Sequence, residues 1–132
     1  MNYKLIALDM DGTLLRKDKT VSERTKKAIE DARKKGVTVV LATGRPIDGV
    51  TKYLEELDMY GENDYVLSYN GGLVLKTKNR EAICKIGLTG EDLHYLYEIS
   101  KELGVNIHAF SETKGLITPK NSKYTEVEAN IN

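Results

Sequence analysis

The chain has 132 residues, and 20 Lys plus Arg balance 20 Asp plus Glu, so its formal charge at pH 7 is zero. This balance argues against nucleic acid or an anionic membrane as the main partner. The length corresponds to about one domain, or to part of a larger one. The single Cys84 cannot form an internal disulfide, and no apolar run approaches the roughly 20 residues of a membrane-spanning helix. With no secretory signal pattern at its start, we expect a cytoplasmic protein.

The first half of the sequence predicts alternating strands and helices. Residues 5–8 are continuously apolar, as is typical of a parallel strand buried on both faces, and residues 37–42 form the next strand. Between them, Ser22 can cap a helix that ends near Gly36. A second helix is expected from Pro46, with Ile47, Val50, Leu54 and Leu57 as its apolar stripe, followed by a strand at 65–69. This order predicts an α/β fold with a Rossmann-like parallel sheet.

The second half departs from this alternation. Residues 73–88 read as a β-hairpin that turns at residues 78–80. Thr89 and Asp92 form a capping box for a helix that Gly104 ends, and short strands are expected at 106–110 and 115–118. We place a boundary near residue 84, on topology rather than composition.

Polar residues follow the three strands of the first half. Asp9 and Asp11 come after the first strand, Thr43 and Gly44 after the second, and Asn70 after the third. Ligands of such sheets gather beyond the carboxyl ends of the strands, so we expect these residues to lie together.

Their chemistry indicates phosphoryl transfer. A carboxylate such as Asp9 can attack phosphorus and form an aspartyl-phosphate, provided that a hard cation such as Mg²⁺ screens the charges. Asp11 could act as general acid and base if its surroundings raise its pKa. The Thr43 hydroxyl and the Gly44 amide, at the start of the expected helix, would cradle the phosphate.

The stretches "DMDGTLL", "LATGRP" and "SYNGG" resemble the motifs of the haloacid dehalogenase superfamily, and more narrowly its Cof-type sugar-phosphate phosphatases with a type IIB cap. The resemblance implies that Asp9 is the nucleophile and a Mg²⁺ ligand. It implies that Asp11 is the general acid and base, with its backbone carbonyl on Mg²⁺. Thr43 would hold the phosphoryl group, and Arg45 and Asn70 would lie near the substrate or order the site.

The resemblance also implies a domain organisation. The connection after Thr13 is too short for an inserted cap, so the cap is expected after Asn70: residues 1–83 would form a partial core and residues 84–132 a partial α+β cap. The superfamily also uses a Lys and an acidic motif beyond a finished cap, and neither can be assigned here. We therefore expect an amino-terminal portion that is inactive alone.

These patterns predict a Mg²⁺-dependent phosphomonoester hydrolase for a small phosphorylated metabolite such as a sugar phosphate. Two alternatives stay open: a phosphosugar mutase of the same superfamily, and a non-catalytic chain that self-associates through exposed sheet edges. Simpler interpretations also exist for single residues. The role of Arg45 could be limited to pairing with an acid, and that of Asn70 to forming a turn. His94, His108 and Cys84 are expected to be structural.

Overall fold

The computed structural model describes residues 3–112 and 114–131, which divide into two compact units, one up to Ile86 and one from Gly87 onward. Among the described residues, no helix has both the length and the apolar character needed to cross a membrane.

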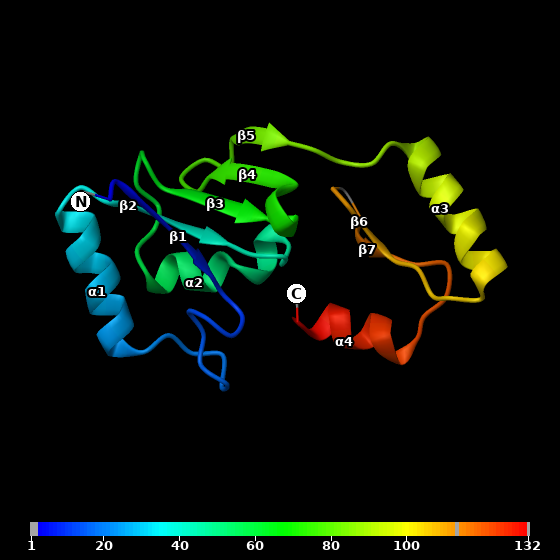
Figure 1. The fold of residues 1–132 in the computed structure, drawn as a ribbon, viewed down its shortest axis with the longest axis horizontal. Helices are drawn as coiled ribbons and strands as arrows, with labels where there is room; N and C mark the ends of the chain where they lie inside the picture. The colour runs from blue at the N-terminus through cyan, green and yellow to red at the C-terminus, as the bar shows by residue number, and fades with distance from the viewer. Residues whose placement is uncertain (1–2, 113, 132) are drawn as a thin grey trace. The chain divides into compact units, whose positions relative to one another are not determined.

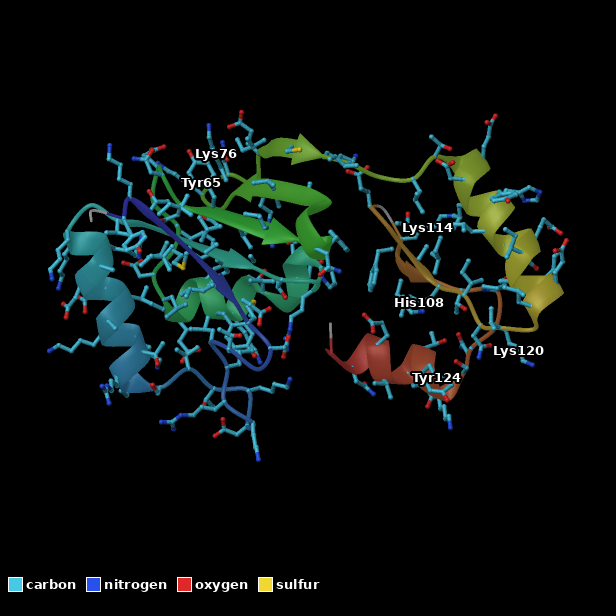
Figure 2. All side chains as sticks on the ribbon, in the orientation of Figure 1. Tyr65, Lys76, His108, Lys114, Lys120 and Tyr124 are labelled. Carbon is cyan, nitrogen blue, oxygen red and sulfur yellow. The ribbon has the colours of Figure 1, made fainter. Side chains whose placement is uncertain are left out.

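The first unit is a five-stranded sheet with helices, in the order β1-β2-β3-β4-β5 (Figure 1). Strands β1 to β3 are parallel, whereas β3, β4 and β5 are antiparallel neighbours, so Tyr65 of β3 lies opposite Lys76 of β4 (Figure 2). The predicted α/β fold and the predicted hairpin are confirmed. The elements are β1 (Leu5–Asp9), α1 (Glu23–Lys34), β2 (Thr38–Ala42), η1 (Ile47–Gly49), α2 (Thr51–Glu56), β3 (Tyr65–Ser68), η2 (Tyr69–Gly71), β4 (Leu73–Lys76) and β5 (Ala82–Lys85).

Helix α1 begins and ends where local sequence chemistry predicts. The Ser22 side chain accepts a hydrogen bond from the Thr25 amide at 3.1 Å, which satisfies one of the free amides of the first turn. The chain leaves the helix through Gly36, whose φ of 79° is in the left-handed region.

Strand β1 is less covered than its sequence predicts. Leu5 and Ile6 are 56% and 37% exposed, although a continuously apolar strand was expected to be buried on both faces. The reason is topological: among the described strands, β1 is at the edge of the sheet and pairs with β2 alone, from Leu5 opposite Thr38 to Asp9 opposite Ala42. Burial is concentrated instead on β2, where Leu41 is fully buried.

The helix predicted from Pro46 is broken into two pieces. A 3₁₀ turn, η1, is followed by the short helix α2, and Gly49, a poor helix former, lies at the junction. The predicted apolar stripe nevertheless faces the core, because Val50, Leu54 and Leu57 are buried and Ile47 packs against them.

Arg33 fastens α1 to the loop before β3. Its guanidinium donates to the backbone carbonyl of Asp58 at 2.7 Å and to the carboxylate of Asp64 at 2.5 Å. Asp64 is buried and also accepts from the Gly61 amide at 2.7 Å. These bonds join segments that are about 30 residues apart in sequence, so they help to set the position of α1 against the sheet.

We expect Asp64→Ala to lower the free energy of unfolding by about 1–3 kcal/mol, because it leaves the Arg33 guanidinium and the Gly61 amide without their acceptor. A urea titration followed by circular dichroism measures this change. Glu30→Ala, which removes an exposed pair with Lys34, is the matched control and should cost much less than Asp64→Ala. Equal effects of the two substitutions would contradict this role of Asp64.

The second unit contains α3 (Gly90–Leu103), the antiparallel pair β6 (Ala109–Ser111) and β7 (Gly115–Ile117), and α4 (Lys123–Ile131). The capping box of Thr89 and Asp92 is present, and Gly104 ends α3 with a φ of 63°. Helix α4 was not predicted. Ser122 caps its amino terminus, where the Ser122 hydroxyl accepts from the Thr125 amide at 3.3 Å. Strand β6 begins three residues later than expected.

The second unit has little buried core. Among its described side chains, in residues 87–112 and 114–130, only that of Ser100 is buried. Residues of α3 and of the β6–β7 hairpin line a cavity of about 460 Å³, and His94 and His108 are among them. His108 also meets the edge of the Phe110 ring, with 6.2 Å between ring centroids.

The division between the units falls after Ile86, whereas the sequence analysis placed it between residues 83 and 84. The earlier position would cut β5, which pairs with β4 through Lys85 opposite Leu73. The assignment of the units as partial core and partial cap stays a prediction.

Candidate active site

The carboxyl ends of β1, β2 and β3 form one edge of the sheet, because Asp9 pairs with Ala42 and Ala42 with Leu67. The loops that follow β2 and β3 are hydrogen-bonded to each other. The Asn70 amide donates to the Thr43 carbonyl at 3.0 Å, and the Tyr69 amide donates to the Arg45 carbonyl at 3.2 Å. The structure thus joins the "TGRP" and "SYNGG" segments at the backbone.

Asp11 is linked to the same loops by an ion cluster. Arg45 donates from Nε to Oδ2 of Asp11 at 2.7 Å and from Nη2 to Oδ1 at 2.8 Å, a two-pronged pairing that orients the carboxylate. Lys19 adds a third bond, from Nζ to Oδ1 at 2.6 Å. Arg45 is buried and Asp11 is 39% exposed, so the pair lies at the border between core and solvent.

Arg45 and Lys19 determine the protonation state of Asp11. The hydrogen bonds from Arg45, reinforced by Lys19, hold the pKa of the Asp11 carboxyl well below its ordinary value, although burial opposes them. The sequence analysis required a raised pKa for the general-acid role, and the structure shows the reverse. Asp11 is a carboxylate at neutral pH in this arrangement.

The lowered pKa predicts how Asp11 affects stability across pH. A carboxyl with a lowered pKa in the folded state stabilises the fold above its unfolded pKa of about 4, and the contribution is lost as the pH falls toward the folded value. We therefore expect Asp11→Asn to destabilise the fold at pH 7 and to cost less at pH 3. Urea titrations at the two pH values measure this difference. A cost that stays constant with pH would show that the ion cluster does not form in solution.

The Asp9 carboxylate is in a different environment. Asp9 is exposed, and no side chain or amide in the described part of the sequence binds its carboxylate. Its backbone is fixed, because its carbonyl accepts from the Leu14 amide at 3.1 Å and the turn passes through Gly12 at a φ of 85°. A fixed backbone that carries a free carboxylate suits a nucleophile.

Thr43 and Gly44 offer two donors to an anion. The Thr43 hydroxyl accepts from the Arg45 amide at 3.2 Å, which leaves its own O–H to donate. Within the described residues, nothing accepts from the Gly44 amide. A Cβ at position 44 would lie 3.0 Å from Oδ1 of Asn70, so glycine permits the close approach of that side chain. The expected helix start is not there, however, because η1 begins only at Ile47.

The turn after β3 has an unusual backbone. Tyr69, Asn70 and Gly71 have successive φ values of 52°, 56° and 90°. Left-handed φ values are unfavourable for bulky residues such as tyrosine and collect at functional sites. Asn70 does form a turn, as the simpler interpretation held, and it also lies against Gly44.

Two residues of this site were missed by the sequence analysis. Lys19 lies in a polar connection with no recognisable motif, and Tyr53 reads as an ordinary helix residue. Tyr53 lies below Arg45, with the guanidinium carbon 5.7 Å from the ring centroid, and its hydroxyl donates to the Lys19 carbonyl at 3.1 Å. Only the fold brings them to Asp11.

The oxygen atoms present are of the kind that Mg²⁺ binds. The free carboxylate of Asp9 and the backbone carbonyl of Asp11 are hard donors, and Mg²⁺ is often held by one or two carboxylates with waters and substrate phosphate. In the described residues, no group of three acidic, His or Cys side chains could hold a metal ion by itself.

The sequence model of the haloacid dehalogenase-like hydrolase family matches residues 6–132. The chain belongs to this family. The predicted membership, drawn from three short motifs, is thereby confirmed.

Individual members of the haloacid dehalogenase-like hydrolases agree with this assignment. YxeH of Bacillus subtilis (strain 168), provisionally named a phosphatase, is 44% identical over 98% of this chain and 48% of its own length. A haloacid dehalogenase-like hydrolase from Bacteroides thetaiotaomicron superposes with a TM-score of 0.82 at 31% identity, over 98% of this chain and 49% of that one. A sugar phosphatase of haloacid dehalogenase subclass IIB superposes with a TM-score of 0.75 at 25% identity, over 94% of this chain and 46% of that one. The chain therefore spans about half the length of these proteins.

Proposed function

We propose that the protein is a Mg²⁺-dependent phosphomonoester hydrolase that acts on small phosphorylated metabolites such as sugar phosphates. The observation that supports this most is the contrast between the two acids of "DMDGT". Asp9 has a free, exposed carboxylate. Two residues later in the sequence, the Asp11 carboxylate is bound by two cations, Lys19 and Arg45. The similarity to a subclass IIB sugar phosphatase favours the substrate class.

In the first step, a carboxylate oxygen of Asp9 attacks phosphorus and the bond from phosphorus to the ester oxygen breaks. The leaving oxygen takes a proton from Asp11, and Asp9 carries the phosphoryl group as an aspartyl-phosphate. In the second step, water attacks phosphorus and gives a proton to Asp11, and the bond to Asp9 breaks. The products are an alcohol, inorganic phosphate and the original enzyme.

Each proposed site residue has a part in these steps. The Thr43 hydroxyl and the Gly44 amide would donate to phosphoryl oxygens, and Asn70 would orient the substrate beside them. Phosphoryl oxygens would compete with Asp11 for Arg45, and transfer of that guanidinium to the substrate would raise the pKa of Asp11. Asp11 could then hold the proton that the leaving group needs.

Mg²⁺ would be held by the Asp9 carboxylate and the Asp11 carbonyl, and when bound it would screen the repulsion between Asp9 and the phosphate.

The exposed, unpaired Cys84 fits a reducing compartment such as the cytoplasm.

The test is phosphate release by the full-length protein from a panel of sugar phosphates, with Mg²⁺ or with a chelator. We expect release that depends on Mg²⁺, and a hydroxamate on the Asp9 peptide when hydroxylamine is added during turnover. Release that persists in chelator would contradict the Mg²⁺ requirement. Formation of an isomeric sugar phosphate without free phosphate would indicate the alternative, a phosphosugar mutase.

A second candidate function is favoured by the exposed edge of the sheet. Leu5 and Ile6 on β1 are apolar and exposed, and β1 pairs on one side only. Such an edge can recruit another strand, so the chain could act as a non-catalytic self-associating protein. Light scattering distinguishes the two candidates, because a stable monomer that releases phosphate would exclude obligate association.

A further inference from the structure

We propose that Lys19 is a positioning residue for Asp11, held over the site by a loop that Tyr53 fastens. This inference rests on the proposed function, since it concerns how Asp11 is oriented during the reaction. Its basis is a second cation on Asp11: Lys19 Nζ lies 2.6 Å from Oδ1, the oxygen that also accepts from Nη2 of Arg45 at 2.8 Å.

The loop that carries Lys19 is tightly built. The Lys19 amide donates to the Arg16 carbonyl and the Arg16 amide to the Thr20 carbonyl, both at 2.9 Å. The Asp18 carboxylate accepts from the amide and the hydroxyl of Thr20, at 3.1 Å and 2.7 Å. Five consecutive exposed residues, 16–20, thus have a defined conformation without a buried core of their own.

Lys19 itself has a left-handed backbone, with a φ of 62°. This conformation is uncommon and unfavourable for a residue with a side chain. In this conformation the Lys19 carbonyl accepts from the Tyr53 hydroxyl at 3.1 Å while its ammonium binds Asp11. The strained conformation therefore serves both contacts.

Tyr53 connects the two cationic residues. It is almost fully buried, its ring lies under the Arg45 guanidinium, and its hydroxyl holds the Lys19 loop. When substrate oxygens compete for Arg45, the pairing of Arg45 with Asp11 weakens. Lys19 would then keep the Asp11 carboxyl in place between substrate and water.

The experiment compares steady-state kinetics of Lys19→Met, Lys19→Arg, Tyr53→Phe and Asp9→Asn in the protein. Lys17→Met is the matched control, because Lys17 is exposed in the same loop and pairs with no acid of the described chain. We expect Lys19→Met to lower kcat by about tenfold or more with KM within about twofold, since misplacement of a reacting group affects turnover. Lys19→Arg should restore most of kcat, and Lys17→Met should match the wild type.

Tyr53→Phe keeps the ring and removes only the hydroxyl, so we expect a smaller fall in kcat. Combined with Lys19→Met it should add little, because both changes loosen the contact of Lys19 with Asp11. An NMR signal from the Lys19 ammonium, ordered in the wild type and lost in Asp11→Asn, tests the contact without activity.

The outcomes separate the two proposals. An unchanged kcat in Lys19→Met, a rise in KM alone, or a disordered Lys19 ammonium would overturn the positioning role while Asp9→Asn remains inactive. Phosphate release that is absent from the wild type, or that persists in Asp9→Asn, would overturn the proposed function and this inference with it.

Discussion

Asp9→Asn is expected to lower phosphate release on the order of 10³-fold or more while leaving the fold intact. The loss follows because an amide oxygen is a far poorer nucleophile than a carboxylate and carries no charge for a cation. The fold should survive because the Asp9 carboxylate is exposed and binds no described residue, so its replacement leaves nothing unpaired. Initial rates with a sugar phosphate and Mg²⁺, beside circular dichroism, measure both effects.

The matched control is Asp31→Asn, which makes the same chemical change at an exposed position on α1. It should retain wild-type activity. Phosphate release by Asp9→Asn within about tenfold of the wild type would exclude Asp9 as the nucleophile. Direct attack by water would then be favoured.

Leu41→Ala is expected to have the largest effect on stability, about 2–5 kcal/mol. Leu41 is fully buried on the interior strand β2, which lies between β1 and β3, so truncation leaves a cavity that the surrounding sheet and helices can fill only in part. A loss of this size is a large share of the free energy of unfolding of a small domain. Urea titrations followed by circular dichroism provide the measurement.

Leu5→Ala makes the same change on the neighbouring strand β1, where the side chain is 56% exposed. We expect a cost below about 1 kcal/mol. A cost as large as that of Leu41→Ala would show that another strand covers β1 in solution. This comparison therefore also tests the candidate role of the β1 edge in association.

Much of the fold can be predicted from short stretches of the sequence. The caps at Ser22 and Thr89, the glycines at 36 and 104, and the apolar run on β2 each specify one element by short-range chemistry. The order of strand, helix and strand then predicts a parallel sheet, because the helix returns the chain to the end of the sheet at which the first strand began. For the same reason the sequence alone predicted that the segments after three strands lie at one edge.

The tertiary structure decided what depends on contacts between distant residues. The exposure of β1 follows from its place at the edge of the sheet, which its apolar composition does not reveal. The charge of Asp11 follows from Arg45, 34 positions later, and from Lys19, placed by a loop conformation. The sequence by itself predicted that Asp11, Thr43 and Asn70 lie near one another, because they follow neighbouring parallel strands. Only the fold determined their protonation and partners, because electrostatic energies depend on distances and burial.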